Sequence, residues 1–161
     1  MNKIAVYPGS FDPVTLGHLD IIRRSNVLFD HIVVAVLNNS KKHPLFSVDE
    51  RKTMLEEATK DFKHVTIDSF DGLLVNYLKK TNISIIIRGL RAITDFEYEL
   101  QIASVNKHLC HSAETCFIMS TNEFAFLSSS IVKEIAQNGG DVSSLVPNVT
   151  CHALQEKMFV C

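Results

Sequence analysis

Five short runs of apolar residues recur along the chain and predict the strands of a buried sheet. Most of these runs are continuous and β-branched and do not alternate with polar residues, which is typical of parallel strands covered on both faces. The runs span residues 4–7, 32–37, 65–67, 83–87 and 115–119.

Between the runs, apolar residues recur at helical spacing and predict helices. Ser47 and Glu50 form an S-x-x-E capping box that opens one of them. Another carries apolar residues at the i, i+4, i+7 and i+11 positions: Tyr98, Ile102, Val105 and Leu109. Strands and helices alternate without repeats or a linker, so we expect a single doubly wound α/β domain over residues 1–161, with a five-stranded parallel sheet.

Length and composition fit one globular domain. The chain has 161 residues, of which 46% are hydrophobic and 21% are charged. The formal net charge is −2, so no general basic field attracts nucleic acid. We therefore expect no nucleic-acid partner, and any bound anion must be held by a local cluster of side chains.

The four cysteines and the apolar runs favour a cytoplasmic protein. No C-x-x-C pair occurs, and the spacing of His108, Cys110, His111 and Cys116 matches no familiar zinc site, so we expect no metal bound by protein side chains. No secretory signal and no run of about 18 apolar residues is present, so we expect no membrane partner.

The segment after the first strand reads P-G-S-F-D-P-V-T-L-G-H and ends at His18. Gly9 and Ser10 allow a ligand to approach the backbone, and Thr15 can cap the next helix with its first amides facing an anion. His18 then lies in the first helical turn, where a bound polyphosphate would favour its charged form. A locally packed or capping histidine is the alternative. Neither G-x-G-x-x-G nor a Walker A motif is present.

Basic and hydroxyl side chains follow the other strands. Lys42 follows the second, and Arg88 and Arg91 follow the fourth, where guanidinium groups can bind phosphate in a bidentate manner. The alternatives are a solvated lysine, and an arginine paired with one of three acidic residues: Asp95, Glu97 or Glu99. After the fifth strand, three serines over residues 128–130 can cap a helix and bind an anion, while Phe124 and Phe126 can stack on a base or pack in the core.

Anion-binding side chains at four strand ends predict a polyphosphate site. Ligands of open parallel sheets bind beyond the carboxyl ends of the strands, where these side chains converge. No nucleophilic triad and no obvious acid–base pair of carboxylates accompanies them. The pattern therefore favours in-line phosphoryl or nucleotidyl transfer through positioning and charge stabilisation.

Three motifs carry a resemblance to a known family. T-L-G-H at residues 15–18 resembles the T/H-x-G-H signature of the nucleotidyltransferase superfamily, and F-L-S-S-S-I-V-K-E at residues 126–134 resembles its second signature. With R-G-L-R at residues 88–91 followed by D-F-E-Y-E, the chain resembles the bacterial phosphopantetheine adenylyltransferases over essentially its whole length. The resemblance implies a Rossmann-like nucleotidyltransferase fold and transfer of AMP from ATP to 4′-phosphopantetheine, giving dephospho-coenzyme A and pyrophosphate.

The resemblance also implies ligands, assembly and roles for particular residues. Family members use Mg²⁺ held mainly by the ATP phosphates, form homohexamers and are inhibited by coenzyme A. The catalytic residues would be His18, Lys42 and Arg91. The acceptor would contact Ser10, Lys42, Leu74 and Arg88. ATP would contact Ser10, Phe11, His18, Gly89, Leu90, Arg91, Glu99, Phe124, Ala125, Phe126, Leu127, Ser128, Ser129 and Ser130. Many relatives have threonine in place of Ser10, and tryptophan or tyrosine in place of Phe124.

Two alternatives stay open at this point. A relative within the superfamily could use nicotinamide mononucleotide or glycerol 3-phosphate as the acceptor. A protein of another class could sense a nucleotide or coenzyme A without turning it over. An acceptor screen distinguishes the first alternative from phosphopantetheine adenylyl transfer. A single-turnover assay distinguishes the second, the sensor, from an enzyme.

Overall fold

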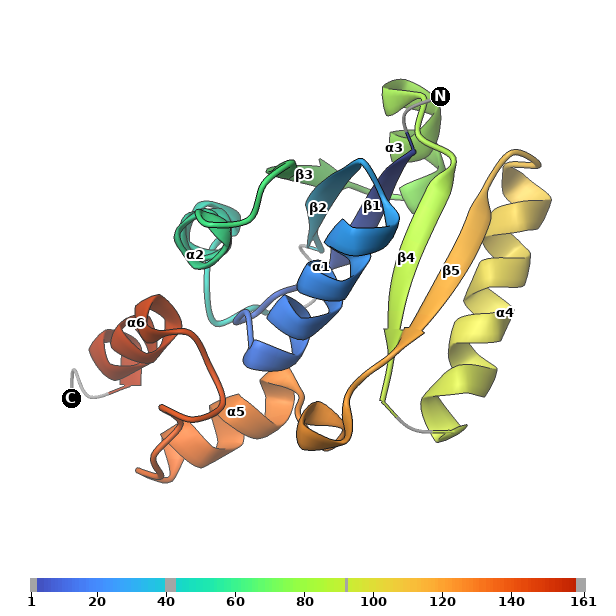
Figure 1. Cartoon of the computed structure of the whole chain (residues 1–161). Coiled ribbons are helices and arrows are strands. Elements are labelled where there is room, and N and C mark those ends of the chain that lie inside the picture. The colour runs from blue at the N-terminus through green and yellow to red at the C-terminus, as the bar shows by residue number, and fades with distance from the viewer. Residues whose placement is uncertain (1–2, 40–42, 92, 159–161) are drawn as a thin grey trace.

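A computed structural model describes residues 3–39, 43–91 and 93–158. Its strands all run parallel and form one sheet in the order β3-β2-β1-β4-β5 (Figure 1). The strands are β1 (Ile4–Gly9), β2 (His31–Asn38), β3 (Val65–Asp71), β4 (Ile85–Leu90) and β5 (Glu114–Met119). The helices are α1 (Leu16–Leu28), α2 (Val48–Thr59), α3 (Leu74–Thr81), α4 (Ile93–Leu109), α5 (Ser129–Gln137) and α6 (Asn148–Met158).

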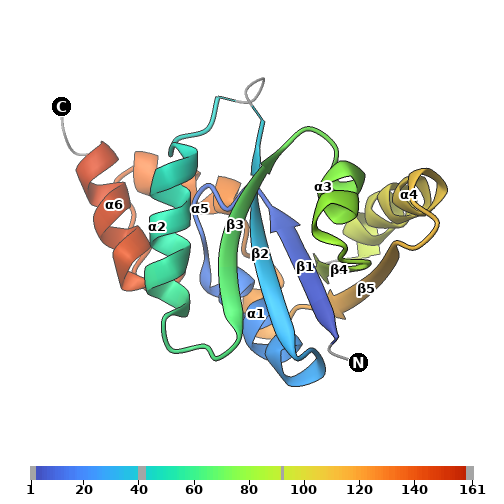
Figure 2. The same cartoon turned by 90° about the horizontal axis from the view of Figure 1, so that it is seen from above.

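Helices cover both faces of the sheet, as Figure 2 shows from above. α1, α2, α5 and α6 lie on one face, and α3 and α4 lie on the other. A buried hydrophobic cluster fills each interface, with Ile22 and Leu55 on the first face and Val75 and Leu78 on the second. The expected doubly wound α/β fold with a five-stranded parallel sheet is therefore confirmed.

The strand order reverses between β1 and β4, and the two strands separate there. β1 pairs with β2 along its whole length, from Ile4 to Gly9. Its pairing with β4 involves only Ala5 and Val6, so the carboxyl ends of β1 and β4 diverge. In sheets of this topology, the crevice at that reversal is where ligands bind.

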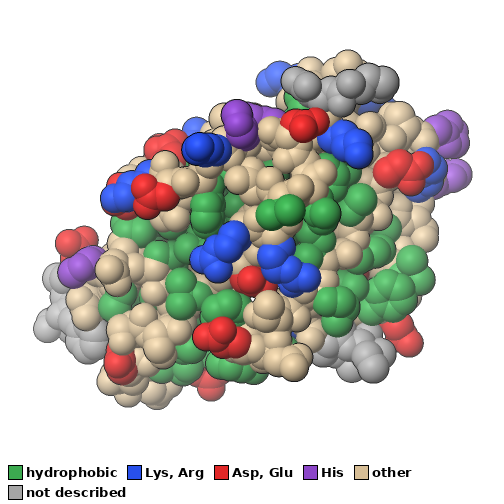
Figure 3. Space-filling model, viewed as in Figure 1, with side chains coloured by type: hydrophobic (Ala, Val, Ile, Leu, Met, Phe, Trp, Pro, Cys, Tyr) green, Lys and Arg blue, Asp and Glu red, His purple; other side chains and the backbone are tan. Residues whose placement is uncertain are grey.

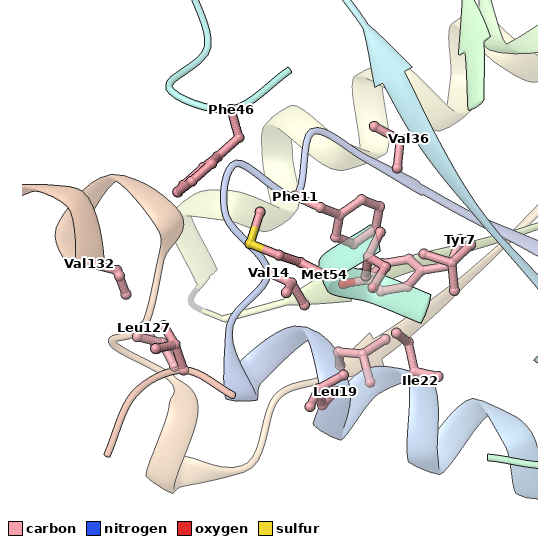
Figure 4. Close-up of a cluster of buried hydrophobic side chains, with 14 of the residues drawn as sticks. Tyr7, Phe11, Val14, Leu19, Ile22, Val36, Phe46, Met54, Leu127 and Val132 are labelled. Atoms are coloured by element: carbon pink, nitrogen blue, oxygen red, sulfur yellow. The ribbon is translucent and has the colours of Figure 1, made fainter. Parts of the chain in front are cut away.

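The turn after β1 is anchored in the hydrophobic core. Phe11 is 2% exposed and Val14 is fully buried, and Figure 4 shows both side chains among Tyr7, Leu19 and Met54. Gly9 is needed below this turn, because a Cβ added there would lie only 2.9 Å from the Phe11 ring. Burial of the aromatic ring therefore fixes the backbone that borders the crevice.

Several elements differ in extent from the sequence-based expectations: β1 and β3 run on to Gly9 and Asp71, and two differences bear on the site. The fourth strand was expected to end before Arg88, but β4 includes Arg88, Gly89 and Leu90 because these residues continue to pair with β5. The helix expected around the Tyr98 stripe is present as α4, yet the four stripe residues are 36–64% exposed. The sheet side of α4 instead carries Glu99, Ala103 and Asn106, which are half-buried.

The cysteines and the helices give two further findings. Cys110, Cys116 and Cys151 are free thiols, and Cys161 lies outside the described residues. None of the helices in the described part of the chain has the length and apolar character that a membrane-spanning segment needs.

Candidate active site

A cavity of about 300 Å³ occupies the crevice between the carboxyl ends of β1 and β4. The first turn of α1 and the start of α5 border it, so two helix N-termini face one space and favour an anion there. Its lining residues are Tyr7, Pro8, Gly9, Ser10, Phe11, Thr15, Gly17, His18, Ile21, Arg88, Gly89, Arg91, Glu99, Ser120, Phe124, Leu127, Ser128 and Ser129.

His18 is held by a capping box at the start of α1. The Thr15 amide donates to Nδ1 of His18 at 3.0 Å, and the His18 amide donates to the Thr15 hydroxyl at 3.3 Å. Because Nδ1 accepts a hydrogen bond from a backbone amide, the proton of the neutral ring lies on Nε2. The ring also contacts Phe11 edge-on, with centroids 5.0 Å apart. The capping box thus leaves Nε2–H as the donor that His18 can offer to a ligand.

Burial, followed by the positive charge of Arg91, lowers the pKa of His18 from 6.5 to about 4. His18 is therefore neutral at pH 7 when no ligand is bound. A polyphosphate in the cavity would add negative charge beside the ring and raise this pKa again.

The lowered pKa predicts an acid-sensitive fold. Between about pH 6.5 and pH 4 the unfolded chain carries a proton on His18 that the folded chain does not, so the free energy of unfolding falls as the pH falls through this window. We expect His18 to account for a loss of up to about 3 kcal/mol between pH 7 and pH 4. Urea unfolding at several pH values should show a shallower loss in His18→Gln than in the parent. The exposed His152, changed to Gln, is the control, and equal slopes in parent and His18→Gln would contradict the assignment.

Arg88 and Glu99 form a bidentate ion pair at the wall of the cavity. Nε and Nη2 of Arg88 each donate to the Glu99 carboxylate at 2.6 Å, and Nη1 donates to the Pro8 carbonyl at 3.0 Å. Burial opposes the charge of Arg88, but the hydrogen bonds and the charge of Glu99 outweigh it and raise the pKa of Arg88. Of the acidic partners considered for the arginines, the structure selects Glu99 for Arg88.

A second cavity, of about 320 Å³, adjoins the first. The two share Pro8, Gly9, Ser10 and the Arg88–Glu99 pair as lining residues. The rest of the second cavity is largely apolar and carries a few polar groups. Its other lining residues are Leu37, Phe70, Gly72, Leu74, Tyr98, Ile102, Ala103, Asn106 and Thr115. A polar cavity and an apolar one thus meet at the end of β1.

A model of the cytidylyltransferase-like family matches residues 6–135, which run from β1 into α5. The chain belongs to the cytidylyltransferase-like family. Among solved structures it is similar to a protein described as a nicotinate-nucleotide adenylyltransferase from Vibrio parahaemolyticus, with a TM-score of 0.74. The two chains are 17% identical, and the match covers 99% of this chain and 96% of the other. At that identity the likeness shows the shared fold.

In this cytidylyltransferase-like chain, most of the expected nucleotide contacts line the first cavity. They are Ser10, Phe11, His18, Gly89, Arg91, Glu99, Phe124, Leu127, Ser128 and Ser129. Leu90, Ala125 and Phe126 do not line it: Leu90 is buried in β4, and Phe126 is 60% exposed. Ser130 borders a separate small cavity with Ser129. The roles of these residues in binding stay predictions.

The expected acceptor contacts lie at the second cavity. Leu74 lines it, and Ser10 and Arg88 line both cavities. Lys42, the remaining contact and an expected catalytic residue, lies outside the described residues. Arg91, the one arginine among the expected catalytic residues, donates to the Leu127 carbonyl at 3.3 Å and so links the end of β4 to the loop before α5.

Sequence reasoning missed Tyr7 and the ring of contacts behind the turn. Tyr7 belongs to an apolar strand and is 6% exposed, so its pattern is that of a core residue, and burial raises its pKa. Asp12 accepts hydrogen bonds from the amides of Leu45 and Phe46 and from Lys133. These partners are 33 to 121 residues from Asp12 in the sequence, so no local motif predicts the contacts.

Proposed function

We propose that the protein is an adenylyltransferase that moves AMP from ATP to 4′-phosphopantetheine, giving dephospho-coenzyme A and pyrophosphate. One observation carries this proposal: a polar cavity with helix N-termini adjoins a largely apolar cavity at Ser10 and Arg88. ATP fits the first by charge, and the arm of phosphopantetheine fits the second.

The nucleotide side of the proposal rests on donors that face the first cavity. Ser128 caps α5, and its side chain accepts from the amide of Ile131 at 3.2 Å, so the first turn of α5 is well formed. The Ser129 hydroxyl donates to the Pro13 carbonyl at 2.7 Å, which joins α5 to the turn after β1. With His18 and Arg91 opposite, these elements supply positive potential for a triphosphate.

The acceptor side rests on the character of the second cavity. Phe70, Leu74 and Ile102 provide apolar surface, and Asn106 provides an amide donor and an amide acceptor. The pantetheine arm has gem-dimethyl and methylene groups that match the former and two amides that match the latter. Glycerol 3-phosphate has no apolar group to cover the apolar lining of this cavity. A mononucleotide would place its polar ribose against that lining, which is unfavourable.

The proposed reaction is a single in-line displacement. A phosphate oxygen of the acceptor attacks the α-phosphorus of ATP, a new P–O bond forms, and the bond to the bridging oxygen breaks. The electron pair leaves with pyrophosphate, and no covalent enzyme intermediate is needed. His18, Lys42 and Arg91 would stabilise the charge that develops on the transferring and leaving oxygens.

Mg²⁺ and coenzyme A belong to the same proposal. In the described part of the chain, no three His, Cys, Asp or Glu side chains gather as metal ligands. We propose that Mg²⁺ is bound by the ATP phosphates, whose charge it would neutralise. Coenzyme A carries both the arm and a nucleotide, so it would compete across the two joined cavities as a feedback inhibitor.

The test is pyrophosphate release with ATP and Mg²⁺ in the presence of different acceptors. We expect release with 4′-phosphopantetheine and not with nicotinamide mononucleotide, nicotinate mononucleotide, glycerol 3-phosphate or buffer alone. Leu74→Asp, which changes only the second cavity, should raise KM for the acceptor more than for ATP. Pyrophosphate release with a mononucleotide would contradict 4′-phosphopantetheine as the acceptor. No release with any acceptor, from a protein that still binds ATP, would indicate a sensor.

Self-association is proposed from the outer face of α4. This helix has large apolar side chains that are exposed, and Figure 3 shows hydrophobic side chains gathered over the β5 and α4 side of the molecule. Apart from Tyr98 and Ile102, which line the second cavity, they are Phe96, Leu100, Val105 and Leu109. Exposed apolar surface on one helix indicates a protein contact. The proposed contact is with other copies of the chain in a homohexamer.

Light scattering after size exclusion tests this assembly. We expect a hexamer for the parent and smaller species for Val105→Glu, because a carboxylate cannot be buried unpaired in an apolar contact. Val27→Glu, at an apolar position on α1 that is 85% exposed, should leave the hexamer intact. A monomeric parent would contradict the proposal, as would a Val105→Glu protein that stays hexameric.

A further inference from the structure

Arg51 is a buried cation behind the turn that follows β1. It lies on α2 and is 2% exposed. Burying a guanidinium group is costly unless it is paired and hydrogen-bonded. Burial lowers the pKa of Arg51, and the negative charge of Asp12 opposes that change.

The hydrogen bonds of Arg51 join three separate segments. Its Nη1 donates to the Ser10 carbonyl at 2.8 Å and to the Leu37 carbonyl at 3.2 Å, and its Nε donates to the Ser47 carbonyl at 3.2 Å. These bonds tie the turn after β1 to the end of β2 and to the start of α2. No described group accepts a hydrogen bond from Nη2, so the burial of this cation is incompletely compensated. A side chain that served stability alone would gain little from such a position.

The bond to Ser10 sets the direction of the next amide. The carbonyl and the N–H of a trans peptide point in opposite directions, so holding the Ser10 carbonyl toward Arg51 turns the Phe11 N–H away from it. Phe11 lines the 300 Å³ cavity, whereas Arg51 borders a different cavity, of about 210 Å³, that Phe11 does not line. Phe11 also has a φ of 47°, a conformation that phenylalanine rarely adopts unless its surroundings impose it.

A hydrogen bond donated to the Ser10 carbonyl also makes the Phe11 N–H of the same peptide a stronger donor. Hydrogen bonds in a chain polarise one another, and a charged donor does so more than a neutral one. α5 holds the same turn from its far side, through Lys133 to Asp12 at 2.7 Å and through Ser129 to the Pro13 carbonyl. The turn is therefore fixed by charged or hydroxyl groups of two helices before any ligand arrives.

We propose that Arg51 is a positioning residue, which holds the Ser10–Phe11 peptide so that its N–H faces a phosphate in the first cavity. The inference rests on the proposed function for its ligand, and it adds a role for a residue that no motif of the sequence includes. Arg51 does not touch the nucleotide. It acts through one peptide plane.

The test compares Arg51→Met and Arg51→Lys with Thr59→Val, which removes a buried side-chain hydrogen bond at the far end of the same helix. The probe is inorganic pyrophosphate, with calorimetry for its affinity and amide NMR for the Phe11 resonance. We expect Arg51→Met to lose at least about 10-fold in affinity and Arg51→Lys about 3-fold, because an ammonium group cannot reach all three carbonyls. Thr59→Val should stay within about twofold of the parent even where urea unfolding shows it to be less stable.

The Phe11 amide provides a measurement that needs no ligand. Its resonance should move in both Arg51 variants and stay in place in Thr59→Val. If Arg51→Met does not fold, the Arg51→Lys variant provides the test. An unchanged Phe11 resonance in that variant, together with parental pyrophosphate affinity, overturns the proposal. A parent that binds neither pyrophosphate nor ATP overturns the proposed function instead, while the ligand-free resonance still reports whether Arg51 orients the peptide.

Discussion

Replacing His18 with alanine is expected to lower kcat by about 10²-fold or more while the protein stays folded. The ring offers one donor, Nε2–H, because the Thr15 amide occupies Nδ1. A donor fixed in this way costs no reorganisation when charge develops on the transferring phosphate, and removing one such donor usually costs 10²- to 10³-fold in rate. The measurement is steady-state pyrophosphate release with ATP and the acceptor that the screen identifies.

A matched control separates this effect from a general loss of histidine. His31 lies at the opposite end of the sheet, where it bonds with the Thr66 hydroxyl, and His31→Ala should keep parental turnover. His18→Asn keeps an N–H donor on a shorter side chain and should recover part of the rate. Parental kcat in a folded His18→Ala protein would remove His18 from the catalytic residues and leave it as a helix cap.

Local patterns in the sequence predicted the fold well. The continuous β-branched runs identified all five strands, and the S-x-x-E box at Ser47 marks the start of α2 with both of its hydrogen bonds formed. The helical spacing of the Tyr98 stripe predicted α4 but not its orientation. Periodicity alone does not distinguish an apolar stripe that faces the core from one that stays exposed in the folded chain, because the spacing is the same in both.

The candidate site was predictable as far as it is built from strand ends. His18, Ser128 and Ser129 follow their strands in local motifs, and the topology brings them together at the reversal of the strand order. The contacts behind the site were not predictable, because each joins residues far apart in the chain. The bond from Arg51 to Ser10 spans 41 residues, and the bond from Lys133 to Asp12 spans 121.

Arg88 shows how a local rule can miss a position inside a strand. An isoleucine run followed by arginine reads as a strand and its exit, yet β4 continues through Arg88 because β5 pairs with it as far as Leu90. The side chain consequently projects from the sheet surface toward Glu99 on α4 and does not lie in a loop. This placement puts one ion pair on the wall between the two cavities.

Arg88→Met is expected to reduce kcat/KM for the acceptor by at least about 10²-fold and also to destabilise the fold. Arg88 lines both cavities, and under the proposed function the acceptor phosphate would lose a guanidinium donor at their junction. The carboxylate of Glu99, whose side chain is 12% exposed, loses both of its charge-assisted bonds. Leaving a largely buried charge unpaired costs about 3 kcal/mol of unfolding free energy, which urea unfolding would measure.

The double variant Arg88→Met/Glu99→Gln separates the two losses. Glutamine removes the unpaired charge with little change in shape, so most of the lost stability should return. Activity should stay low, because the phosphate still lacks its donor. Recovery of activity together with stability would mean that Arg88 only counters Glu99 and takes no part in holding the acceptor. Arg88→Lys, which keeps the charge but cannot bind Glu99 in a bidentate manner, should fall between the parent and Arg88→Met in both measurements.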